Sequence, residues 1–165
     1  SDLTGMELAN ATLLDESTAA AEAMTLLAAV RSRAQKKNDV VKFFVDKEVL
    51  PQTLSVLETR ALPVGVELVI GNPQEFDFSS EFFGALLQSP SASGEVHDYA
   101  GFIAKAKEAD IKVAVAAIIK DKVPAGIYNL SDQHYGHIIL FYSPPFLLHH
   151  LMLIHYLESL DDEEN

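Results

Sequence analysis

The 165-residue sequence contains no cysteine and no tryptophan, and it has half as many basic as acidic residues. Without cysteine, neither a disulfide framework nor a thiolate metal cage can form, which fits a reducing compartment. Twelve Lys and Arg against 24 Asp and Glu give a formal net charge of -12. Because this charge repels phosphate backbones and anionic lipid surfaces, we expect no nucleic-acid partner and no membrane partner.

The 165-residue sequence shows neither the pattern of a signal peptide nor a long apolar run. The first residues show no basic stretch followed by an apolar run, so no signal peptide is visible. The longest apolar segments, 138–142 and 146–157, are too short or too interrupted by histidine to span a bilayer. We therefore expect a soluble, cytoplasmic protein.

Helix-forming and strand-forming segments alternate along the first two thirds of the chain. Residues 8–33 have strong helix composition, and the cap-forming residues 15–18 inside this segment leave open two helices or one bent helix. Two further helices are predicted, one from Pro51 to Pro63 and one after a cap at Asp98. Apolar segments rich in β-branched or aromatic residues predict four strands, which are 40–45, 66–70, 82–87 and 111–119.

This alternation is typical of right-handed βαβ units. It predicts a three-layer α/β fold of the Rossmann-like type, with a mostly parallel sheet of about five strands and helices on both faces. Residues 138–142 are expected to form the fifth strand, and an apolar helix is expected to follow Pro144 and Pro145. Polar residues 35–39 are expected to lead into the first strand, and residues 161–165 form an acidic tail. The whole chain, 1–165, is expected to be a single domain.

Several sequence blocks between residues 5 and 117 follow one another in a distinctive order. They are GMELANATLLDE at 5–16, FFVD at 43–46, PQTLSVLETRA at 51–61, GVELVIG at 65–71, FGALLQ at 83–88, GEVHDY at 94–99 and VAVAA at 113–117. The blocks resemble the glycine cleavage system P-protein, the pyridoxal-phosphate-dependent glycine dehydrogenase (decarboxylating). The resemblance implies the large domain of a fold-type I pyridoxal-phosphate enzyme, and the mitochondrial matrix as the location if the sequence is eukaryotic. Residues 118–165 do not match, and we expect them to supply an unrelated strand and helix that complete the sheet.

Two positions depart from this family where its cofactor would be held. Leu50 stands where the family commonly has a histidine that stacks on the cofactor ring, and Ile118 stands where it has an aspartate that pairs with the pyridine nitrogen. The family's Schiff-base lysine comes from a later segment that has no counterpart here. Lys120 and Lys122, beside an aspartate in a polar turn, are expected to be solvated. The resemblance therefore implies no catalytic residue and no bound cofactor in this chain.

Three hypotheses for the function follow. The first is a non-catalytic α/β scaffold derived from a P-protein, as a natural fragment, a chimera or a designed protein. The second is a part of glycine dehydrogenase (decarboxylating) that acts only with a partner chain supplying the lysine. The third is a metal or small-ligand binding module at the carboxyl ends of the parallel strands, where open α/β sheets usually bind ligands.

Histidines give the weak candidates for a metal site. Asp132, His134 and His137 lie within six residues of one another and could bind zinc or nickel. On the predicted helix, His149, His150 and His155 would not share a face. We therefore expect turn and surface histidines and no metal site.

His97 and Asp98 could form a dyad, but no nucleophile with a clear motif accompanies them. Capping and loop roles are favoured for these two residues and for Ser89, Ser91 and Ser93. The predicted helix between Phe146 and Leu157 is apolar on nearly every side, which indicates either deep burial or an interface in a homodimer.

Overall fold

The structure is a computed structural model of the 165-residue chain, and it describes residues 15–118, 137–142 and 152–155. Its centre is one six-stranded sheet, in the order β2-β1-β3-β4-β5-β6. The strands are β1 (Lys42–Asp46), β2 (Glu67–Gly71), β3 (Phe82–Ser89), β4 (Lys112–Ile118), β5 (His137–Tyr142) and β6 (Met152–His155). Neighbours from β2 to β5 pair in parallel, and β6 pairs antiparallel with β5. The predicted mostly parallel sheet is confirmed, with one strand more than expected.

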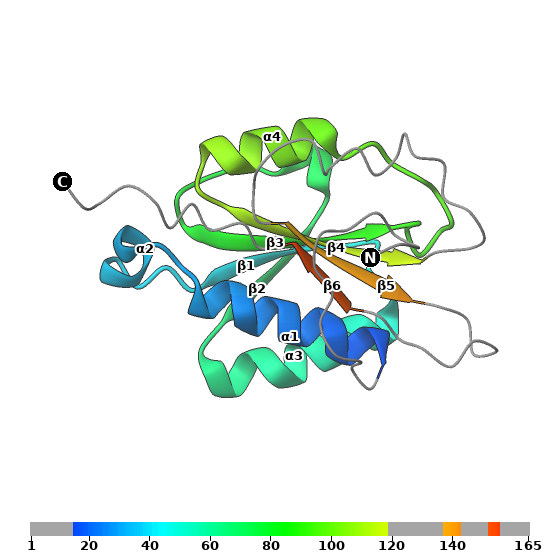
Figure 1. Ribbon diagram of the computed structural model, residues 1–165, viewed down its shortest axis with the longest axis horizontal. Helices are drawn as coiled ribbons and strands as arrows, with labels where there is room; N and C mark the ends of the chain where they lie inside the picture. The colour runs from blue at the N-terminus through cyan, green and yellow to red at the C-terminus, as the bar shows by residue number, and fades with distance from the viewer. Residues whose placement is uncertain (1–14, 119–136, 143–151, 156–165) are drawn as a thin grey trace.

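Helices cover both faces of this sheet, as predicted. They are α1 (Glu16–Ala29), α2 (Arg33–Lys37), α3 (Pro51–Val64), α4 (Ala100–Glu108) and the short 3-10 helix η1 (Pro73–Glu75). Figure 1 shows α1 and α3 below the sheet and α4 above it. We call these sides the α1 face and the α4 face. Within the described residues, no helix combines the length and the apolar character needed to cross a bilayer.

The helix boundaries follow local capping chemistry. The Asp15 side chain accepts a hydrogen bond of 2.6 Å from the Thr18 backbone N–H and begins α1, so the described part of residues 8–33 holds one helix up to Ala29. Pro51 occupies the first turn of α3, and Gly65 ends that helix at a φ of 69°. Asp98 lies one residue before the cap position of α4, where its side chain accepts a hydrogen bond from the Ala100 N–H.

Two segments differ from the sequence-based expectation. Residues 33–37 form the helix α2, because the side chains of Ser32 and Gln35 cap each other's backbone N–H groups. Met152–His155 is the strand β6, so the helix predicted from Phe146 to Leu157 is wrong over these four residues. A short apolar run fits a strand as well as a helix, and β6 pairs antiparallel with β5 at the edge of the sheet. The rest of that predicted helix and the tail 161–165 lie outside the described residues.

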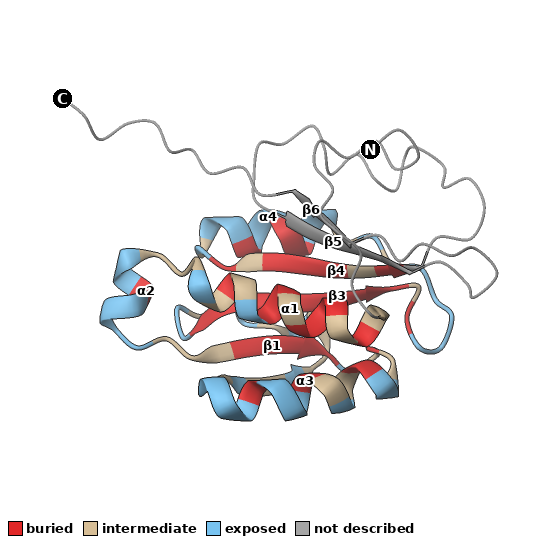
Figure 2. Cartoon of the chain, turned by 60° about the horizontal axis from the view of Figure 1, so that its bottom comes forward, coloured by how far each residue is buried: buried red, intermediate tan, exposed pale blue. Residues whose placement is uncertain are grey.

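The central strands are buried on both faces (Figure 2). On the α1 face, the small side chains of α1 pack with phenylalanines and leucines of the sheet and α3. On the α4 face, the buried core combines the rings of Phe44, Phe82 and Phe102 with aliphatic side chains. The strand residues alternate between the faces, since Phe43 and Val45 belong to the first cluster and Phe44 to the second. By the same alternation, Asp46 lies on the α4 face.

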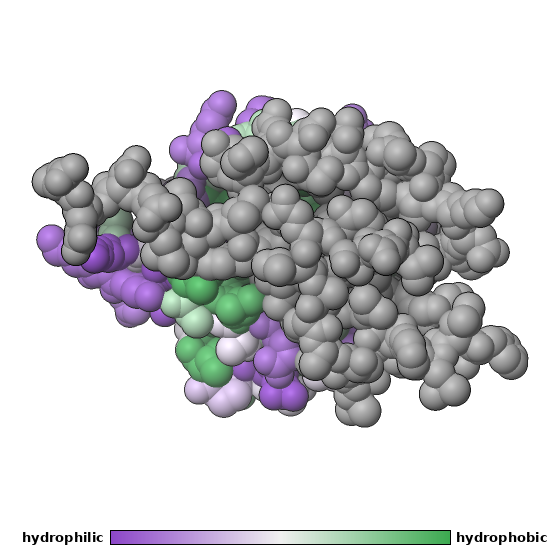
Figure 3. Space-filling view, in the orientation of Figure 1, coloured by the Kyte–Doolittle hydropathy of each residue, from purple (hydrophilic) through white to green (hydrophobic). Residues whose placement is uncertain are grey.

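Polar and apolar side chains are mixed on the outer surface of α3. Leu62 and Val64, near its end, remain 83% and 53% exposed. Figure 3 shows hydrophobic atoms next to hydrophilic ones on the side of the molecule where α1 and α3 lie. Scattered exposed apolar residues of this kind are normal on protein surfaces.

Candidate functional site

The sheet has a topological switch point between β1 and β3. From β1, the chain passes through α3 on the α1 face to β2 on one side, whereas β3 lies on the other side of β1 and leads to α4. The segments leaving the carboxyl ends of β1 and β3 therefore run to opposite faces. Open α/β sheets bind ligands in the crevice that this divergence leaves. In this structure, a cleft of about 680 Å³ lies at that place.

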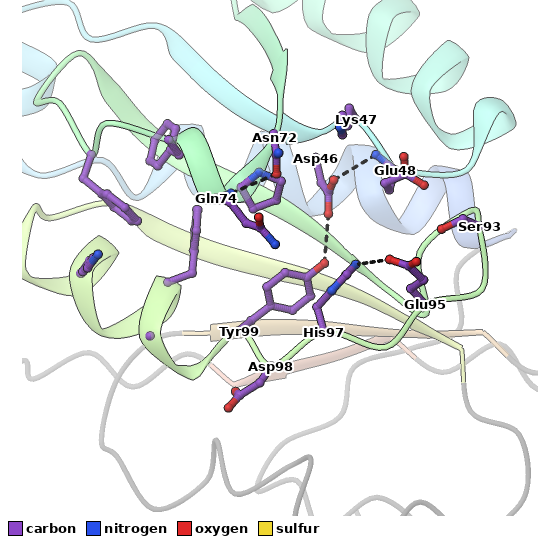
Figure 4. Close-up of a pocket in the computed structure, with 16 residues that line it drawn as sticks. Asp46, Lys47, Glu48, Asn72, Gln74, Ser93, Glu95, His97, Asp98 and Tyr99 are labelled. Atoms are coloured by element: carbon purple, nitrogen blue, oxygen red, sulfur yellow. Dashed lines mark hydrogen bonds and ion pairs between the residues drawn. The ribbon is translucent and has the colours of Figure 1, made fainter.

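A buried carboxylate forms the base of the cleft. Asp46 ends β1 and is only 2% exposed. One of its oxygens, Oδ1, accepts a hydrogen bond of 2.9 Å from the Glu48 backbone N–H. The other, Oδ2, accepts one of 3.1 Å from the hydroxyl of Tyr99 (Figure 4). Each oxygen keeps a further lone pair, so Asp46 can accept additional donors.

Tyr99 joins the start of α4 to both central strands. Its hydroxyl faces two acceptors, Asp46 Oδ2 and the backbone carbonyl oxygen of Gln88, the latter at 3.0 Å. Burial, and then the negative charge of Asp46, raise the pKa of Tyr99 above its ordinary value of 10.0. The phenol therefore stays protonated at neutral pH and serves as a hydrogen-bond donor.

The loop after β3 forms the rim of the cleft. Ser91 Oγ lies 2.8 Å from Ser93 Oγ and accepts a hydrogen bond from the Glu95 N–H. The Ala92 N–H donates to the Glu48 carbonyl oxygen at 2.8 Å, which ties the loop to the chain after β1. These serines have structural roles in the loop, as expected.

The predicted alternative of a His97–Asp98 dyad does not form. His97 Nε2 instead lies 3.4 Å from Glu95 Oε2, and the Asp98 side chain accepts the Ala100 N–H. Figure 4 shows His97 beside Tyr99 and directed toward Glu95, with Asp98 pointing away from this pair. His97 thus lies in the loop, and Asp98 accepts a backbone N–H at the start of α4 from one residue before the cap position.

Aromatic rings form the opposite wall of the cleft. Phe76, just after η1, has its ring centroid 4.4 Å from that of Phe44, 4.8 Å from that of Phe78 and 5.5 Å from that of Phe102. Lys105 Nζ lies 5.8 Å from the centroid of the Phe78 ring. The cleft therefore combines a polar, mostly acidic side with an aromatic side.

Leu50 and Ile118, the positions where the resemblance implies the family's ring-binding groups, lie at the carboxyl edge of the sheet, the side where β1 to β4 end. Leu50 is the cap residue of α3, is partly buried, makes no side-chain capping hydrogen bond and does not line the cleft. Ile118 is the last residue of β4. A leucine and an isoleucine supply neither an imidazole to stack on a pyridine ring nor a charge to pair with its nitrogen. These residues do not fit the ring of pyridoxal phosphate.

Most of the weak metal candidates fall outside the described residues. These are Asp132, His134, His149 and His150, and the lysines Lys120 and Lys122 lie outside as well. His137 begins β5 and His155 ends β6, where the strand register places their Cα atoms opposite each other. Among the residues that the structure describes, no three His, Cys, Asp or Glu residues form a group that could hold a metal ion.

The comparison with known proteins assigns the family. The sequence model of the glycine cleavage system P-protein matches residues 1–121 of this chain. This chain belongs to the glycine cleavage system P-protein family. The match is slightly longer than the blocks between residues 5 and 117 that carry the resemblance in the sequence.

Bacterial relatives agree with this assignment, and a solved structure agrees with the fold. The chain is 67% identical over 118 residues to the glycine dehydrogenase (decarboxylating) of Flavobacterium johnsoniae. It is 62% identical over 119 residues to that of Christiangramia forsetii. Each match covers 72% of this chain but only 12% of the relative. The fold resembles a crystal structure of glycine decarboxylase (P-protein) of the glycine cleavage system in inhibitor-bound form, with a TM-score of 0.64 at 20% identity over 94% of this chain and 36% of that one.

The blocks that carry the P-protein resemblance include Asp46 and Tyr99, but the resemblance did not indicate that these two residues contact each other. Asp46 and Tyr99 are 53 residues apart in the sequence, and neither stands in a catalytic motif. The available signal was an ionisable residue directly after the buried strand residues Phe43 to Val45. That signal indicates a polar group at the carboxyl edge of the sheet, but it does not identify the partner.

Proposed function

We propose that this chain is a non-catalytic α/β unit of the P-protein family with a structural role. The described residues build the sheet and its covering helices, and they do not by themselves support pyridoxal-phosphate chemistry. The observation that carries this proposal is the pair Leu50 and Ile118, which place apolar side chains at the two family positions for ring stacking and ring pairing.

The packing at the carboxyl edge supports a structural role. The buried hydroxyls of Ser17 and Thr53, 3.3 Å apart, link the first turns of α1 and α3. Asp46 and Tyr99 link β1 to α4 in the same way. The strand β5 extends the sheet next to β4, the last strand within the matched segment 1–121. In this proposal, residues after 121 complete the sheet from outside the family, as expected for a fragment or a chimera.

A spectroscopic titration tests the proposal. The purified chain is mixed with pyridoxal phosphate, and its absorbance is scanned for an internal aldimine before and after borohydride reduction. We expect only the spectrum of free cofactor and no labelled lysine in the peptide map. A specific lysine adduct, or release of carbon dioxide from glycine by this chain alone, would contradict the proposal.

A second candidate is favoured by the high identity to glycine dehydrogenases (decarboxylating). The chain is 67% identical to the matched segment of the Flavobacterium johnsoniae protein, of which the match covers 12%. Under this hypothesis, the chain acts only in a complex with another chain that supplies the lysine and the remaining cofactor pocket.

Complementation distinguishes the two candidates. The Flavobacterium johnsoniae protein, produced without the matched segment, is mixed with this chain and assayed for exchange of glycine carboxyl carbon with bicarbonate. Restored exchange together with co-elution on a sizing column supports the second candidate. If neither appears while the intact relative is active, the structural role stands.

A further inference from the structure

More acidic than basic side chains line the cleft. Four carboxylates line it, from Asp46, Glu48, Glu95 and Asp98, against the two ammonium groups of Lys47 and Lys105. Four acidic and two basic side chains give a formal net charge of -2 when histidine is not counted. Clefts lined mainly by one sign concentrate ligands of the opposite sign.

The aromatic wall adds a surface for a flat or apolar group. Phe76 and Phe78 are only partly buried, and both line the cleft together with Phe102 and Tyr99. Aromatic faces attract cations as well as apolar groups. The volume of about 680 Å³ is of the size that small-molecule sites have in proteins.

We infer that this cleft binds an organic cation, with a primary ammonium group directed to Asp46 and Glu95 and an aromatic or apolar body against Phe76 and Phe78. Three observations on different residues agree on this ligand: the position at the switch point, the buried acceptor at the base and the aromatic wall. The inference concerns the α4 face and is independent of the proposed structural role.

Other ligand classes fit the cleft less well. An anion would meet the carboxylates of Asp46 and Glu95 with only two exposed lysines to balance them. A metal ion would need a compact group of ligands, and the described residues contain no such group. A neutral alcohol could use the aromatic wall, but it would gain nothing from the net charge.

A matched series of ligands tests the inference on the full chain. The probes are 2-phenylethylammonium, neutral 2-phenylethanol and anionic phenylacetate, which share a ring and differ in charge. Binding is followed by the shifts of backbone amide signals in nitrogen-15 NMR spectra. We expect the ammonium compound to bind several-fold more tightly than the alcohol, and phenylacetate to bind most weakly.

The second readout is which residues have shifted backbone amide signals when the ligand binds. Signals should move in residues 46–48, 72–78 and 93–102. They should stay in place around Lys42 and Glu81, which form an ion pair near the opposite end of the sheet. Equal binding of the alcohol and the ammonium compound, or shifts confined to other residues, would overturn the inference.

Charge-removing variants then assign the site. Asp46→Asn should weaken binding of 2-phenylethylammonium by roughly tenfold or more, because it removes a buried charged acceptor. Glu95→Gln should weaken binding of 2-phenylethylammonium by roughly two- to fivefold, because the Glu95 carboxylate is exposed and solvent screens its attraction for the ammonium group. Glu58→Gln is the matched control, since it removes one exposed charge from α3 and should leave binding unchanged.

The outcome can be read even if one variant does not fold. If Asp46→Asn is unfolded, the double variant Glu95→Gln with Asp98→Asn decides, because both side chains are exposed. Unchanged binding in that double variant, or an equal loss in Glu58→Gln, would refute the site.

Discussion

The two faces of the central sheet are packed by different kinds of side chain. On the α1 face, α1 contributes Ala20, Ala23 and Met24, all fully buried, against Phe43 and its neighbours. On the α4 face, a nine-residue helix packs on a cluster of phenylalanines. The first face is closed along the length of α1, whereas the second leaves Phe76 and Phe78 partly exposed beside the cleft.

This contrast shows how packing decides where a ligand site can remain. Alanines let α1 approach the sheet closely, and Gly84 lies so near Phe43 that an added Cβ would be 2.9 Å from its Cε2 atom. On the α4 face, Phe76, Phe78 and Phe102 line the cleft beside the nine-residue helix α4. The family match covers the strands β1 to β4, and the cleft of about 680 Å³ opens on the more loosely packed α4 face.

The largest expected effect comes from removing a ring on the closed face. Phe43→Ala should lower the free energy of unfolding by about 3–5 kcal/mol, because a fully buried ring leaves a cavity. Phe78→Ala on the open face should cost only about 1–2 kcal/mol, since this ring is partly exposed. Urea unfolding followed by circular dichroism measures both. Equal losses would show that the two faces are packed equally tightly.

A single added methyl group tests the close approach on the α1 face. Gly84→Ala should lower the free energy of unfolding by about 1–3 kcal/mol, because the new Cβ would also lie 3.2 Å from Leu27 Cδ1. The measurement is the shift of the urea midpoint at an unchanged slope. A neutral result would mean that Phe43 and Leu27 can move aside, and the contrast between the faces would weaken.

Tyr99→Phe tests the hydrogen bonds that hold α4 to the sheet. Losing the hydroxyl should cost about 1–2 kcal/mol, because Asp46 Oδ2 and the Gln88 carbonyl oxygen then lose the single partly buried O–H donor that lies between them. Thermal unfolding at pH 7 provides the measurement. A change within experimental error would show that water replaces the hydroxyl without loss.

The same variant has a distinct pH dependence. Because the pKa of Tyr99 is raised in the folded state, its contribution to stability is complete below the unfolded value near 10 and is lost as the pH rises above it. The wild-type chain should therefore lose more stability than Tyr99→Phe between pH 9 and pH 11. Parallel curves for the two proteins would contradict the assignment.

The smallest expected effect has the opposite sign. Gly101→Ala in α4 should raise the free energy of unfolding by about 0.5–1 kcal/mol, because alanine favours helix and nothing lies within 4 Å of the added Cβ. Thermal unfolding compared with Gly84→Ala sets an open glycine against a crowded one. A loss of stability would show that the α4 face is more crowded than its geometry indicates.

Much of the fold could be predicted from local sequence features. Apolar runs bounded by proline and glycine predict five of the strands and the helix that starts at Pro51. These signals depend only on neighbouring residues, so the sequence alone gives them. The predicted strands lie around residues 40–45, 66–70, 82–87, 111–119 and 138–142. The helix α2 was missed because its capping box lies within a polar segment. The strand β6 was mistaken for a helix because an apolar run by itself has no period.

The sequence predicts the location of the candidate site in the fold but not the contacts between its residues. The carboxyl ends of the strands were expected to hold any ligand, and the cleft is there. The interaction of His97 with Glu95 rather than Asp98 depends on how the loop turns, which spacing in the sequence does not give. The contact of Tyr99 with Asp46 depends on the order of the strands in the sheet.

The sequence by itself determined the fold class and the family, because hydrophobic periodicity and long matched blocks are local properties of the chain. It also determined the apolar residues at positions 50 and 118, which argue against pyridoxal-phosphate chemistry. Only the tertiary structure decided that Asp46, Tyr99 and the phenylalanine wall share one cleft. The physical reason is that β1 lies between β2 and β3, so segments far apart in the sequence diverge from the same edge and leave space between them.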